Sequence, residues 1–354
     1  MKILVINTVP FIRDGTSSVI MDNYRALKDR VSFDFVVNTE IVEEFKGEML
    51  RAKSNIYFIK NRKKNPINYF FALRKILKKA NYDVIHIHGN SSLLSLELLS
   101  IKEKQKIITH GHNVSTDYPI LNIILKPYFK RNFGVGVVPT MEAGRFLFED
   151  KSFHIIPNGI ELSKYAFDLE ARKKVRKSLG INNEKIIICV GNLTEQKYQE
   201  LLITILPQLL KKVECIVLLV GEGKKRGELM ELVNEKKVAR NVKFLGSVSD
   251  VQNYYSAADV FVLPTYFESF GLVAIEAEVN GLPCIVSDCV PRIVKQAEDF
   301  YFVANSDLDL WVDLILQERR KGAARDLRMF SIEKISEELL KVYQEVSSKQ
   351  RRLK

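Results

Sequence analysis

The sequence predicts an α/β protein with two domains, each a doubly wound parallel sheet. Short strand patterns alternate with helical patterns along most of the chain, as βαβ units require. The length of 354 residues is too great for one ordinary domain and suits two of roughly 170 residues. The composition, 46% hydrophobic and 27% charged, is that of a globular protein whose halves can each bury a core.

Residues 1–165 are predicted to form the first domain. Its first helix follows a loop that contains Gly15, placed as in a phosphate-binding turn, although Asp-Gly-Thr lacks the glycine spacing of dinucleotide sites. The turn at 157–160, Pro-Asn-Gly-Ile, has residues that accept turn dihedral angles. Strands are expected at 2–7, 32–38, 56–59, 83–88, 106–110, 134–139 and 154–156, and helices at 17–28, within 60–80 and at 141–148.

Residues 185–330 are predicted to form a second Rossmann-like domain, after a charged linker helix region at 166–184. The segment 331–354 carries an amphipathic helix and a basic end. Strands are expected at 185–190, 215–220, 242–245, 260–263 and 284–287, and helices at 199–210, 251–257, 310–317 and 332–346. In an open parallel sheet the loops after the strands meet at the carboxyl edge, where ligands bind.

The positive charge is concentrated in the first half of the chain. Residues 1–180 contain 30 Lys and Arg against 18 Asp and Glu, and the whole chain has a net charge of +11. A basic face attracts an anionic partner, and the candidates are nucleic acid, acidic lipid and a phosphate-bearing substrate. We expect no nucleic acid, because the chain has no recognised nucleic-acid motif and no basic run interleaved with aromatic residues.

The most basic patch, at 60–80, leaves two interpretations open. Its helix has aromatic residues on one face and lysines on the other, and such a helix can lie on an acidic membrane. In the alternative, the apolar stripe faces the sheet and the lysines are solvated. The chain has no run of 18 apolar residues and no signal-peptide core after Met1. We therefore expect a cytoplasmic protein, associated peripherally at most with the inner face of the membrane.

Four of the five histidines lie at the ends of two expected strands. His86 and His88 share one strand face, as do His110 and His112, because side chains alternate along a strand. A metal site is one interpretation, but no carboxylate lies beside them in sequence, and we predict no metal. A hydrogen-bonded core histidine is the alternative, above all for His86. The four cysteines, 189, 215, 284 and 289, are expected to be reduced core thiols.

The strongest functional signal lies at 261–288, where strand, loop, helix and strand follow one another. Glu268 and Glu276 lie eight residues apart across the loop and the helix start. Between them, the backbone N–H groups of Phe270, Gly271 and Leu272 are expected at a helix N-terminus, which binds anionic or hydroxyl oxygens. Two such glutamates alone are an ordinary surface pair, but their place at a strand end favours a site for a polyol phosphate.

A second loop at a strand end carries Lys197. The strand at 185–190 is followed by Gly-Asn-Leu-Thr-Glu-Gln-Lys, which runs into a helix. A lysine at a helix N-terminus is a common way to hold a diphosphate, because the helix dipole and the ammonium both neutralise its charge. Lys197, Glu268 and Glu276 are therefore expected in one crevice of the second sheet.

The stretch 264–287 resembles the Glu-x7-Glu signature of the retaining glycosyltransferases of family 4, whose members have the GT-B architecture with an interdomain cleft. The segment 191–197 is similar to their Gly-Arg-Leu…Lys-Gly segment, and 157–160 to the turn that ends their first domain. The resemblance covers residues 1–290 approximately. It implies transfer of a sugar from a nucleotide-diphosphate sugar, here expected to be UDP-linked, without a metal or other cofactor. It also implies that the final helix crosses back to the first domain.

The resemblance implies a role for each matching residue of the second domain. Lys197 and the N–H groups of residues 270–272 would stabilise the leaving diphosphate. Glu276 would accept hydrogen bonds from the ribose hydroxyls, and Glu268 would hold hydroxyls of the transferred sugar. Val248 lies in the loop that covers the nucleotide base through backbone contacts.

In the first domain the resemblance implies that His112 orients the transferred sugar, with His110 as the fallback. Gly15 and Asn158 are weaker, loop-level candidates. No residue is assigned as a nucleophile.

Two positions depart from the family pattern. Asn192 stands in place of the arginine, and Tyr198 in place of a glycine. Losing a guanidinium beside a diphosphate removes a bidentate partner on the order of 1.5–3 kcal/mol. The rate or the choice of donor is therefore expected to differ.

The segments 82–90, 110–113 and 281–288 look most like bacterial capsular or exopolysaccharide assembly enzymes, which extend a lipid-linked oligosaccharide at the inner membrane face. We therefore expect a lipid-linked or polysaccharide acceptor. The alternative is a non-catalytic GT-B subunit that stabilises a partner glycosyltransferase, suggested by the two departures. Retention of Lys197, Glu268 and Glu276 argues against it.

Overall fold

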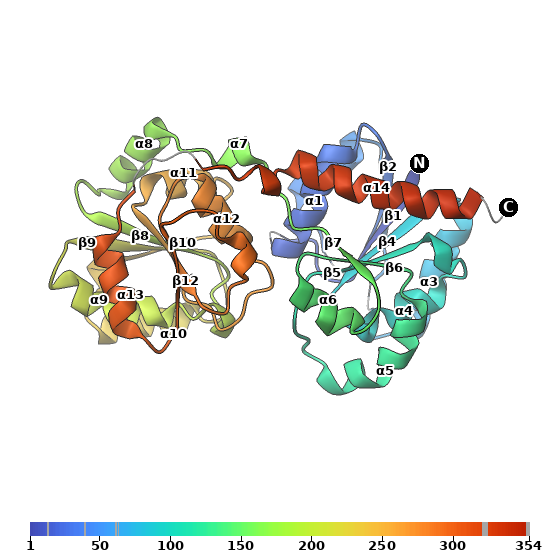
Figure 1. Ribbon diagram of the computed structural model, residues 1–354, viewed down its shortest axis with the longest axis horizontal. Coiled ribbons are helices and arrows are strands. Elements are labelled where there is room, and N and C mark those ends of the chain that lie inside the picture. Colours follow the sequence, from blue (N-terminus) through green and yellow to red (C-terminus); the bar gives the residue numbers. More distant parts are fainter. Residues whose placement is uncertain (13, 39, 61, 63, 321–324, 352–354) are drawn as a thin grey trace. The chain divides into compact units, whose positions relative to one another are not determined.

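The computed structural model describes residues 1–12, 14–38, 40–60, 62, 64–320 and 325–351, with the side chains of 349–351 left aside. The chain divides into two compact units. Unit 1 comprises Met1–Ile160 and Met329–Lys354, and unit 2 comprises Glu161–Arg328. Figure 1 shows a twisted sheet between helices in each unit.

Unit 1 contains a parallel sheet of seven strands in the order β3-β2-β1-β4-β5-β6-β7, within the described residues. This order is that of a doubly wound sheet, with the reversal of winding between β1 and β4. The strands are β1 Lys2–Asn7, β2 Ser32–Val37, β3 Ile56–Phe58, β4 Val84–Gly89, β5 Ile107–Gly111, β6 Val135–Val138 and β7 Phe153–Ile155. The helices are α1 Gly15–Leu27, α2 Glu43–Arg51, α3 Pro66–Lys79, α4 Ser95–Ser100, α5 Pro119–Asn132, α6 Met141–Phe148 and α14 Ile332–Arg351.

The two faces of this sheet are covered by different helices. Residues of α1, α2 and α14 pack on one face, in a core that includes Tyr24, Met49 and Tyr343. Residues of α3, α4, α5 and α6 pack on the other face, in a core that includes Leu73 and Phe129. Alternate residues of each strand enter the two cores, as parallel strands buried on both faces require.

Unit 2 repeats the same winding, in the order β10-β9-β8-β11-β12-β13, with the reversal between β8 and β11. Its strands are β8 Lys185–Val190, β9 Cys215–Val220, β10 Val242–Gly246, β11 Val260–Leu263, β12 Cys284–Ser287 and β13 Phe300–Val303. Its helices are α7 Leu162–Tyr165, α8 Leu169–Leu179, α9 Glu200–Leu210, α10 Arg226–Glu235, α11 Val251–Ala257, α12 Leu272–Val279 and α13 Leu308–Gln317. The predicted pair of doubly wound parallel sheets is confirmed.

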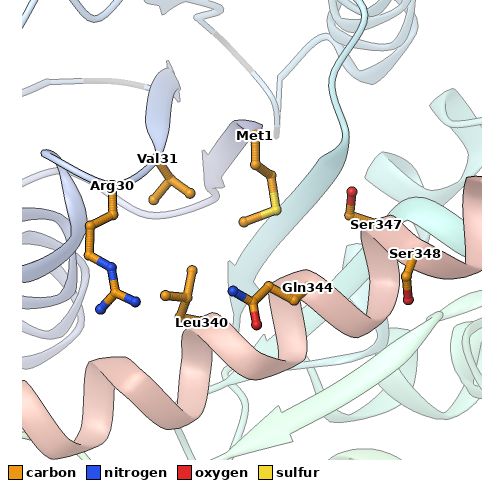
Figure 2. Close-up of a pocket in the computed structure, with 7 residues that line it drawn as sticks. All are labelled: Met1, Arg30, Val31, Leu340, Gln344, Ser347 and Ser348. Carbon is orange, nitrogen blue, oxygen red and sulfur yellow. The ribbon is translucent and has the colours of Figure 1, made fainter.

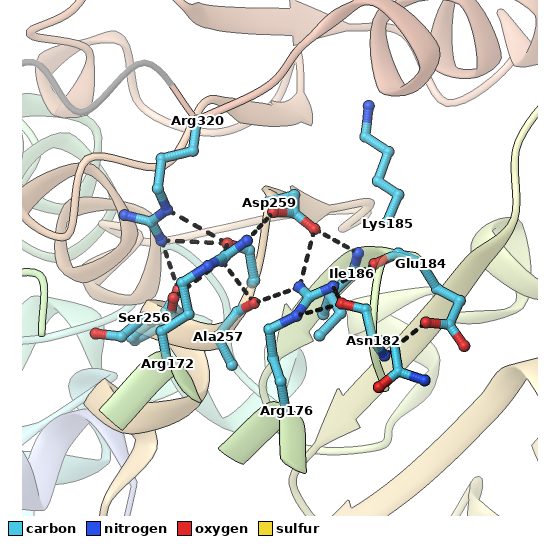
Figure 3. A network of polar contacts seen from close by, with 12 residues as sticks. Arg172, Arg176, Asn182, Glu184, Lys185, Ile186, Ser256, Ala257, Asp259 and Arg320 are labelled. Atoms are coloured by element: carbon cyan, nitrogen blue, oxygen red, sulfur yellow. Dashed lines mark hydrogen bonds and ion pairs between the residues drawn. The ribbon is translucent and has the colours of Figure 1, made fainter. Parts of the chain in front are cut away.

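Helix α8, in the region expected as a linker, is fastened to unit 2 by a network of charged side chains (Figure 3). Arg172 pairs with Asp259 at 2.6 Å and donates to the carbonyl oxygens of Ala257 and Ala258 at 2.8 Å each. Arg176 approaches the second carboxylate oxygen of Asp259 at 3.3 Å. Two guanidinium groups on one acidic side chain tie the helix to the end of α11 and the start of β11.

Local capping shifts several predicted helix starts. α1 begins at Gly15 because the Asp14 carboxylate accepts from the backbone N–H of Ser17 at 2.8 Å. α3 begins at Pro66, after Asn65 as its N-cap, and α8 begins after Asp168. The sequence patterns predict helices after the turns at 89–91 and 221–223, where α4 and α10 lie, but missed α2, α5, α7 and β13.

Three cysteines, Cys189, Cys215 and Cys284, are buried thiols as expected, but Cys289 is exposed. It follows β12, in the loop at the strand end, where its thiol contacts the carbonyl oxygen of Thr265 at 3.0 Å. The prediction of a core position for Cys289 was wrong, because the apolar run ends before it.

Within the described residues, no helix is both long and apolar enough to span a bilayer.

A pocket of unit 1 lies between the chain start, the α1–β2 turn and α14 (Figure 2). It is lined by Met1, Arg30, Val31, Leu340, Gln344, Ser347 and Ser348. It lies where β1 and β2 begin, at the amino edge of the sheet, whereas the predicted site residues of unit 1 follow strand ends.

Candidate functional site

The ammonium of Lys197 and the carboxylate of Glu268 form an ion pair in unit 2. Lys197 ends the loop after β8, and Glu268 lies in the loop after β11. These strands are neighbours at the reversal of winding, which is where doubly wound sheets bind ligands. Both side chains are mostly buried, at 16% and 12% exposure. The structure thus brings together two residues that the sequence placed in one crevice.

Hydrogen bonds between the two loops hold this pair in place. The Thr265 hydroxyl donates to the carbonyl oxygen of Gln196 at 2.9 Å, and the backbone N–H of Tyr266 donates to the same oxygen at 2.8 Å. The Gln196 side-chain amide returns a bond to the carbonyl oxygen of Phe267 at 2.9 Å. The residues just before Lys197 and Glu268 are therefore cross-linked, which fixes the position of both charges.

Helix α12 starts beside Glu268. Gly271 is its N-cap, with φ +93° in the left-handed region, which only glycine adopts readily. The first bond of the helix runs from the N–H of Ala274 to the carbonyl oxygen of Gly271 at 2.9 Å. The N–H groups of Gly271 and Leu272 precede it, so this terminus can take up oxygen acceptors. The Phe270 ring is buried in the core, so only its backbone suits the predicted role.

Glu276 lies on α12 and accepts a hydrogen bond at 2.9 Å from the hydroxyl of Tyr255 on α11. Burial, with the Glu276 charge as the next cause, raises the pKa of Tyr255, so the phenol stays protonated and donates. This bond orients the Glu276 carboxylate. A carboxylate held in this way can accept hydrogen bonds from a diol, the role predicted for it.

The two departures from the family pattern lie in the loop after β8. The Asn192 side chain is exposed, and the backbone carbonyl oxygen of Asn192 accepts from the side-chain amide of Gln199 at 3.1 Å. Tyr198 has φ +45°, a conformation in which glycine is favoured, and its ring stacks on Tyr266 at 4.4 Å between centroids. Val248 is half-buried in the loop after β10.

In unit 1, four histidines form one cluster at the ends of β4 and β5. His88 and His112 share a hydrogen bond of 2.8 Å, and His86 and His110 share one of 3.2 Å. The second nitrogen of His86 lies 2.7 Å from the hydroxyl of Tyr343 on α14. Among the residues that the structure describes, Nε2 of His110 and Nδ1 of His112 are buried without a hydrogen-bond partner.

Burial keeps these imidazoles neutral. It lowers the pKa of His86 and of His112 to about 3, and burial together with the neighbouring imidazoles lowers the pKa values of His88 and His110 as well. A neutral His112 donates through one nitrogen and accepts through the other. Because one nitrogen is engaged with His88, its Nδ1 is the atom with bonding capacity left for a hydroxyl group.

Three of the histidines could approach a metal ion. One nitrogen each of His86, His88 and His110 lies within 4.8 Å of the others, the one such group in the described part of the chain. Imidazole nitrogens are common ligands of zinc, at 2.0–2.1 Å from the ion. The expectation of no metal stays a prediction.

Gly15 and Asn158 lie at two other places in unit 1, the first at the start of α1 and the second in a turn. Gly15 is exposed, and a Cβ added there would meet no atom of the described residues within 4 Å. The fold therefore does not require glycine at this position. Asn158 lies in the turn before the chain leaves unit 1, and its side-chain oxygen is buried with no hydrogen-bond partner in the described part of the chain.

Sequence reasoning missed the residues that position the predicted ones. Tyr255 is hydrogen-bonded to Glu276, and Tyr343 to His86. Each tyrosine lies on the apolar face of a helix, so the sequence pattern explains it as an ordinary core residue. Gln196 and Thr265 adjoin the predicted loops, and their polar side chains at strand ends were the available signal.

Comparisons with known proteins identify the family and the fold. Residues 13–164 match the family model "Glycosyltransferase Family 4", and residues 171–321 match "Glycosyl transferases group 1". Similar curated proteins include the putative glycosyltransferase EpsF of Bacillus subtilis, 25% identical over 92% of this chain and 89% of that protein. Another is the Escherichia coli UDP-Gal:α-D-GlcNAc-diphosphoundecaprenol α-1,3-galactosyltransferase, 24% identical over 74% of this chain and 72% of that protein.

Among solved structures, Anabaena HepE in complex with UDP and glucose has a TM-score of 0.81, with 17% identity, 97% of this chain and 99% of that chain covered. Sucrose-phosphate synthase from Thermosynechococcus elongatus has a TM-score of 0.79, with 19% identity, 98% of this chain and 100% of that chain covered. At these identities the likeness concerns the fold. With two family models that follow one another along the chain and match its two halves, the protein belongs to glycosyltransferase family 4 and has the GT-B fold.

Proposed function

We propose that the protein is a retaining, metal-independent hexosyl- or glycosyltransferase that moves a sugar from a UDP-linked donor to a lipid-linked or polysaccharide acceptor in capsule or exopolysaccharide assembly. The observation that carries the proposal is the Lys197–Glu268 ion pair, held at the reversal of winding of unit 2 beside the N-terminus of α12. Cationic and N–H donors lie there beside a carboxylate, which suits a diphosphate attached to a polyol.

The charges of this site suit the departure of a nucleotide diphosphate. As the bond from the sugar to the diphosphate breaks, negative charge builds up on the phosphate oxygens. The Lys197 ammonium has three N–H donors, so it can serve a phosphate oxygen while it still contacts Glu268. The N–H groups at Gly271 and Leu272 add hydrogen-bond donors, so the negative charge can be stabilised without a metal ion. We propose that Glu268 holds hydroxyls of the transferred sugar and that Glu276, oriented by Tyr255, holds the ribose.

His112 is proposed to contact hydroxyls of the transferred sugar. Its support lies within unit 1: the imidazole is neutral, His88 fixes one nitrogen, and the other nitrogen has no partner among the described residues. The backbone around Val248 is proposed to cover the base, and Asn192 to lie beside the diphosphate.

The relatives support the proposed donor and acceptor classes. The E. coli relative is named for UDP-galactose and a diphosphoundecaprenol acceptor, and the HepE structure contains UDP. An acceptor anchored in lipid has to be reached at the membrane surface, so we propose peripheral association through the basic first half of the chain.

A thermal-shift screen with UDP, GDP and their sugars tests the donor. Binding to the folded state alone raises the melting temperature, and we expect UDP and one UDP-sugar to do so. Slow UDP release from that sugar, unchanged by EDTA, supports a metal-independent enzyme. The anomeric configuration of the product, read by NMR, tests retention.

The alternative, a non-catalytic subunit, is favoured by Asn192 and Tyr198, which replace the family arginine and glycine. It predicts that no nucleotide shifts the melting temperature and that no donor is hydrolysed. Either result, the absent thermal shift or the absent hydrolysis, would overturn the enzyme proposal if an active relative gives a positive result in the same assay.

A further inference from the structure

Helix α5 of unit 1 exposes its apolar side chains. Ile120, Ile123 and Ile124 are 74%, 71% and 65% exposed. These positions follow helical spacing, so they form one stripe along the first two turns. The opposite side buries Asn122, whose side-chain oxygen accepts from the backbone N–H of Ser92 at 2.7 Å. An ordinary surface helix has its apolar stripe on the core side, and in the first two turns of α5 this arrangement is reversed, whereas Phe129 farther along is buried in the core.

Helix α3 adds a second exposed apolar surface. Its inner face, with Tyr69 and Leu73, is buried on the sheet, as the solvated-lysine interpretation of this helix expects. Ile67 and Phe71 nevertheless point outward at 70% and 63% exposure, in the first two turns.

The two stripes belong to one side of unit 1. α3 packs on α4, and α4 packs on α5, so the three helices form a row on one face of the sheet (Figure 1). α3 follows β3, and α5 follows β5. In a parallel sheet the starts of such helices lie at the carboxyl edge. Ile67 and Phe71, like the isoleucines of α5, are therefore near the edge that carries the histidine cluster.

Cations predominate around these stripes, although Lys130 of α5 pairs with Glu149 and Asp150 and the exposed Asp117 precedes this helix. The segment 60–80 contains eight Lys and Arg residues, and α5 contains three, with no Asp or Glu in either. Lys64, Lys75, Lys78 and Lys79 are exposed, and so is Arg131 at the end of α5. Apolar side chains bordered by cations are complementary to a bilayer with anionic headgroups, because the bilayer offers an apolar interior next to a layer of negative charge.

We propose that the face formed by α3 and α5 docks on an anionic phospholipid bilayer, with the α5 isoleucines, Ile67 and Phe71 in the interfacial region and the lysines among the headgroups. This inference rests on the proposed function, because it specifies how the protein reaches a lipid-linked acceptor. The orientation would bring the carboxyl edge of the first sheet, with His112, close to the membrane surface.

Co-sedimentation of the full chain with vesicles tests the apolar stripe. Vesicles of phosphatidylcholine with about one third phosphatidylglycerol should bind the protein, and pure phosphatidylcholine should bind it weakly. The triple variant Ile120→Ser, Ile123→Ser, Ile124→Ser should lose roughly tenfold or more in partitioning, because little else anchors α5. The matched control removes three other exposed leucines, as Leu50→Ser, Leu169→Ser, Leu310→Ser, and should bind like the wild type.

A charge variant tests the headgroup contacts. Lys75→Glu with Lys78→Glu should weaken binding to the anionic vesicles, and high salt should abolish the difference. The control pair, Lys174→Glu with Lys177→Glu, changes the net charge equally on the exposed side of α8 in unit 2 and should have a smaller effect.

A tryptophan introduced at Ile123 reports insertion directly. The single natural tryptophan, Trp311, is fully buried, so a vesicle-dependent blue shift belongs to the new residue. Leu50→Trp is the control, on the other face of the sheet, and should show no shift. Equal vesicle binding by the triple variant and the wild type, or an absent shift at position 123, would overturn the proposal.

Sedimentation velocity tests whether a second copy of the chain, and not a membrane, binds to this face. A wild-type dimer that the triple variant converts to a monomer, without vesicle binding, would mean that the face joins two copies, and the proposal would fail. The proposed chemistry is tested separately, because UDP-induced thermal shifts need no vesicles. The triple variant should keep the wild-type melting temperature and the wild-type shift with UDP, since its changed side chains point into solvent.

Discussion

Lys197 and Glu268 meet as an ion pair although 71 positions separate them in the sequence. The two side chains are 16% and 12% exposed, so removing either one leaves the charge of its partner buried without a counter-ion and poorly solvated. The pair also fixes the only lysine of the loop 191–198 next to the helix N-terminus that the proposed donor would approach.

Lys197→Ala should lower kcat/KM for UDP-sugar turnover by roughly 10²–10³-fold, the usual effect of removing one donor to a developing negative charge. Glu268→Gln should also lower it. The double variant should lose less than the sum of the two free-energy changes, since the residues act as a unit. UDP release measures all three. Lys225→Ala, which removes a lysine paired with Glu228 on another loop of unit 2, is the control. Full activity of Lys197→Ala would refute the assigned role.

Asn192→Arg should strengthen donor binding. The Asn192 side chain is exposed in the loop after β8, so a guanidinium can be accommodated, and a bond to a phosphate contributes about 1.5–3 kcal/mol. We expect the KM for the donor to fall by roughly tenfold or more. Asn183→Arg adds the same charge at an exposed position before β8 and should change nothing. Weaker donor binding by Asn192→Arg would show that this loop does not hold the diphosphate.

The sequence predicted the fold well because the winding of a parallel sheet follows from alternating strand and helix patterns. Helix α5 was missed for a physical reason: its isoleucines face solvent, so its pattern does not resemble that of a core-facing helix. Lys197 and Glu268 could be placed at one sheet edge, but their direct contact could not, because it depends on the bonds of Gln196 and Thr265. The contact of His86 with Tyr343, 257 positions away, has no local signal at all.

Gly15→Ala and Gly271→Ala should distinguish a glycine that lets a ligand come close from a glycine that the backbone conformation requires. Position 15 is the first residue of α1 with open space around it, so Gly15→Ala should keep or raise stability by about 0.4–1 kcal/mol. Lower donor or acceptor affinity in that variant would therefore report a close ligand. Gly271 has φ +93°, so Gly271→Ala should destabilise by about 1–2 kcal/mol. Urea unfolding measures both. An equal loss of stability in the two variants would contradict this account.

The histidine cluster should make unit 1 sensitive to acid. Burial lowers the pKa of His86 and of His112 to about 3, from an ordinary value of 6.5, so below pH 6.5 the unfolded chain takes up protons that the folded chain refuses. Stability is then fully present above pH 6.5 and falls as the pH drops toward 3, by about 1.4 kcal/mol per pH unit for each such histidine.

His112→Gln should remove about that much slope from the free energy of unfolding between pH 6 and pH 4, measured by urea titration at each pH. His154 is the exposed fifth histidine, and His154→Gln should leave the slope unchanged. A wild-type slope equal to that of His112→Gln would mean that the imidazole is protonated in the folded protein.

Glu278→Gln should stabilise unit 2 at alkaline pH. Burial raises the pKa of Glu278 on α12 to about 7, against an ordinary value of 4.5, although the backbone N–H of Gln296 opposes the shift. A carboxyl group with a raised folded pKa contributes its full stability below pH 4.5 and loses it as the pH rises through 7. At pH 8 the charged form therefore costs about 3 kcal/mol, which a neutral amide of the same shape avoids. The urea midpoint should rise at pH 8 and change little near pH 5. Glu231→Gln, at an exposed position of α10, is the control, and a destabilised Glu278→Gln at pH 8 would show that the folded protein keeps this carboxylate charged.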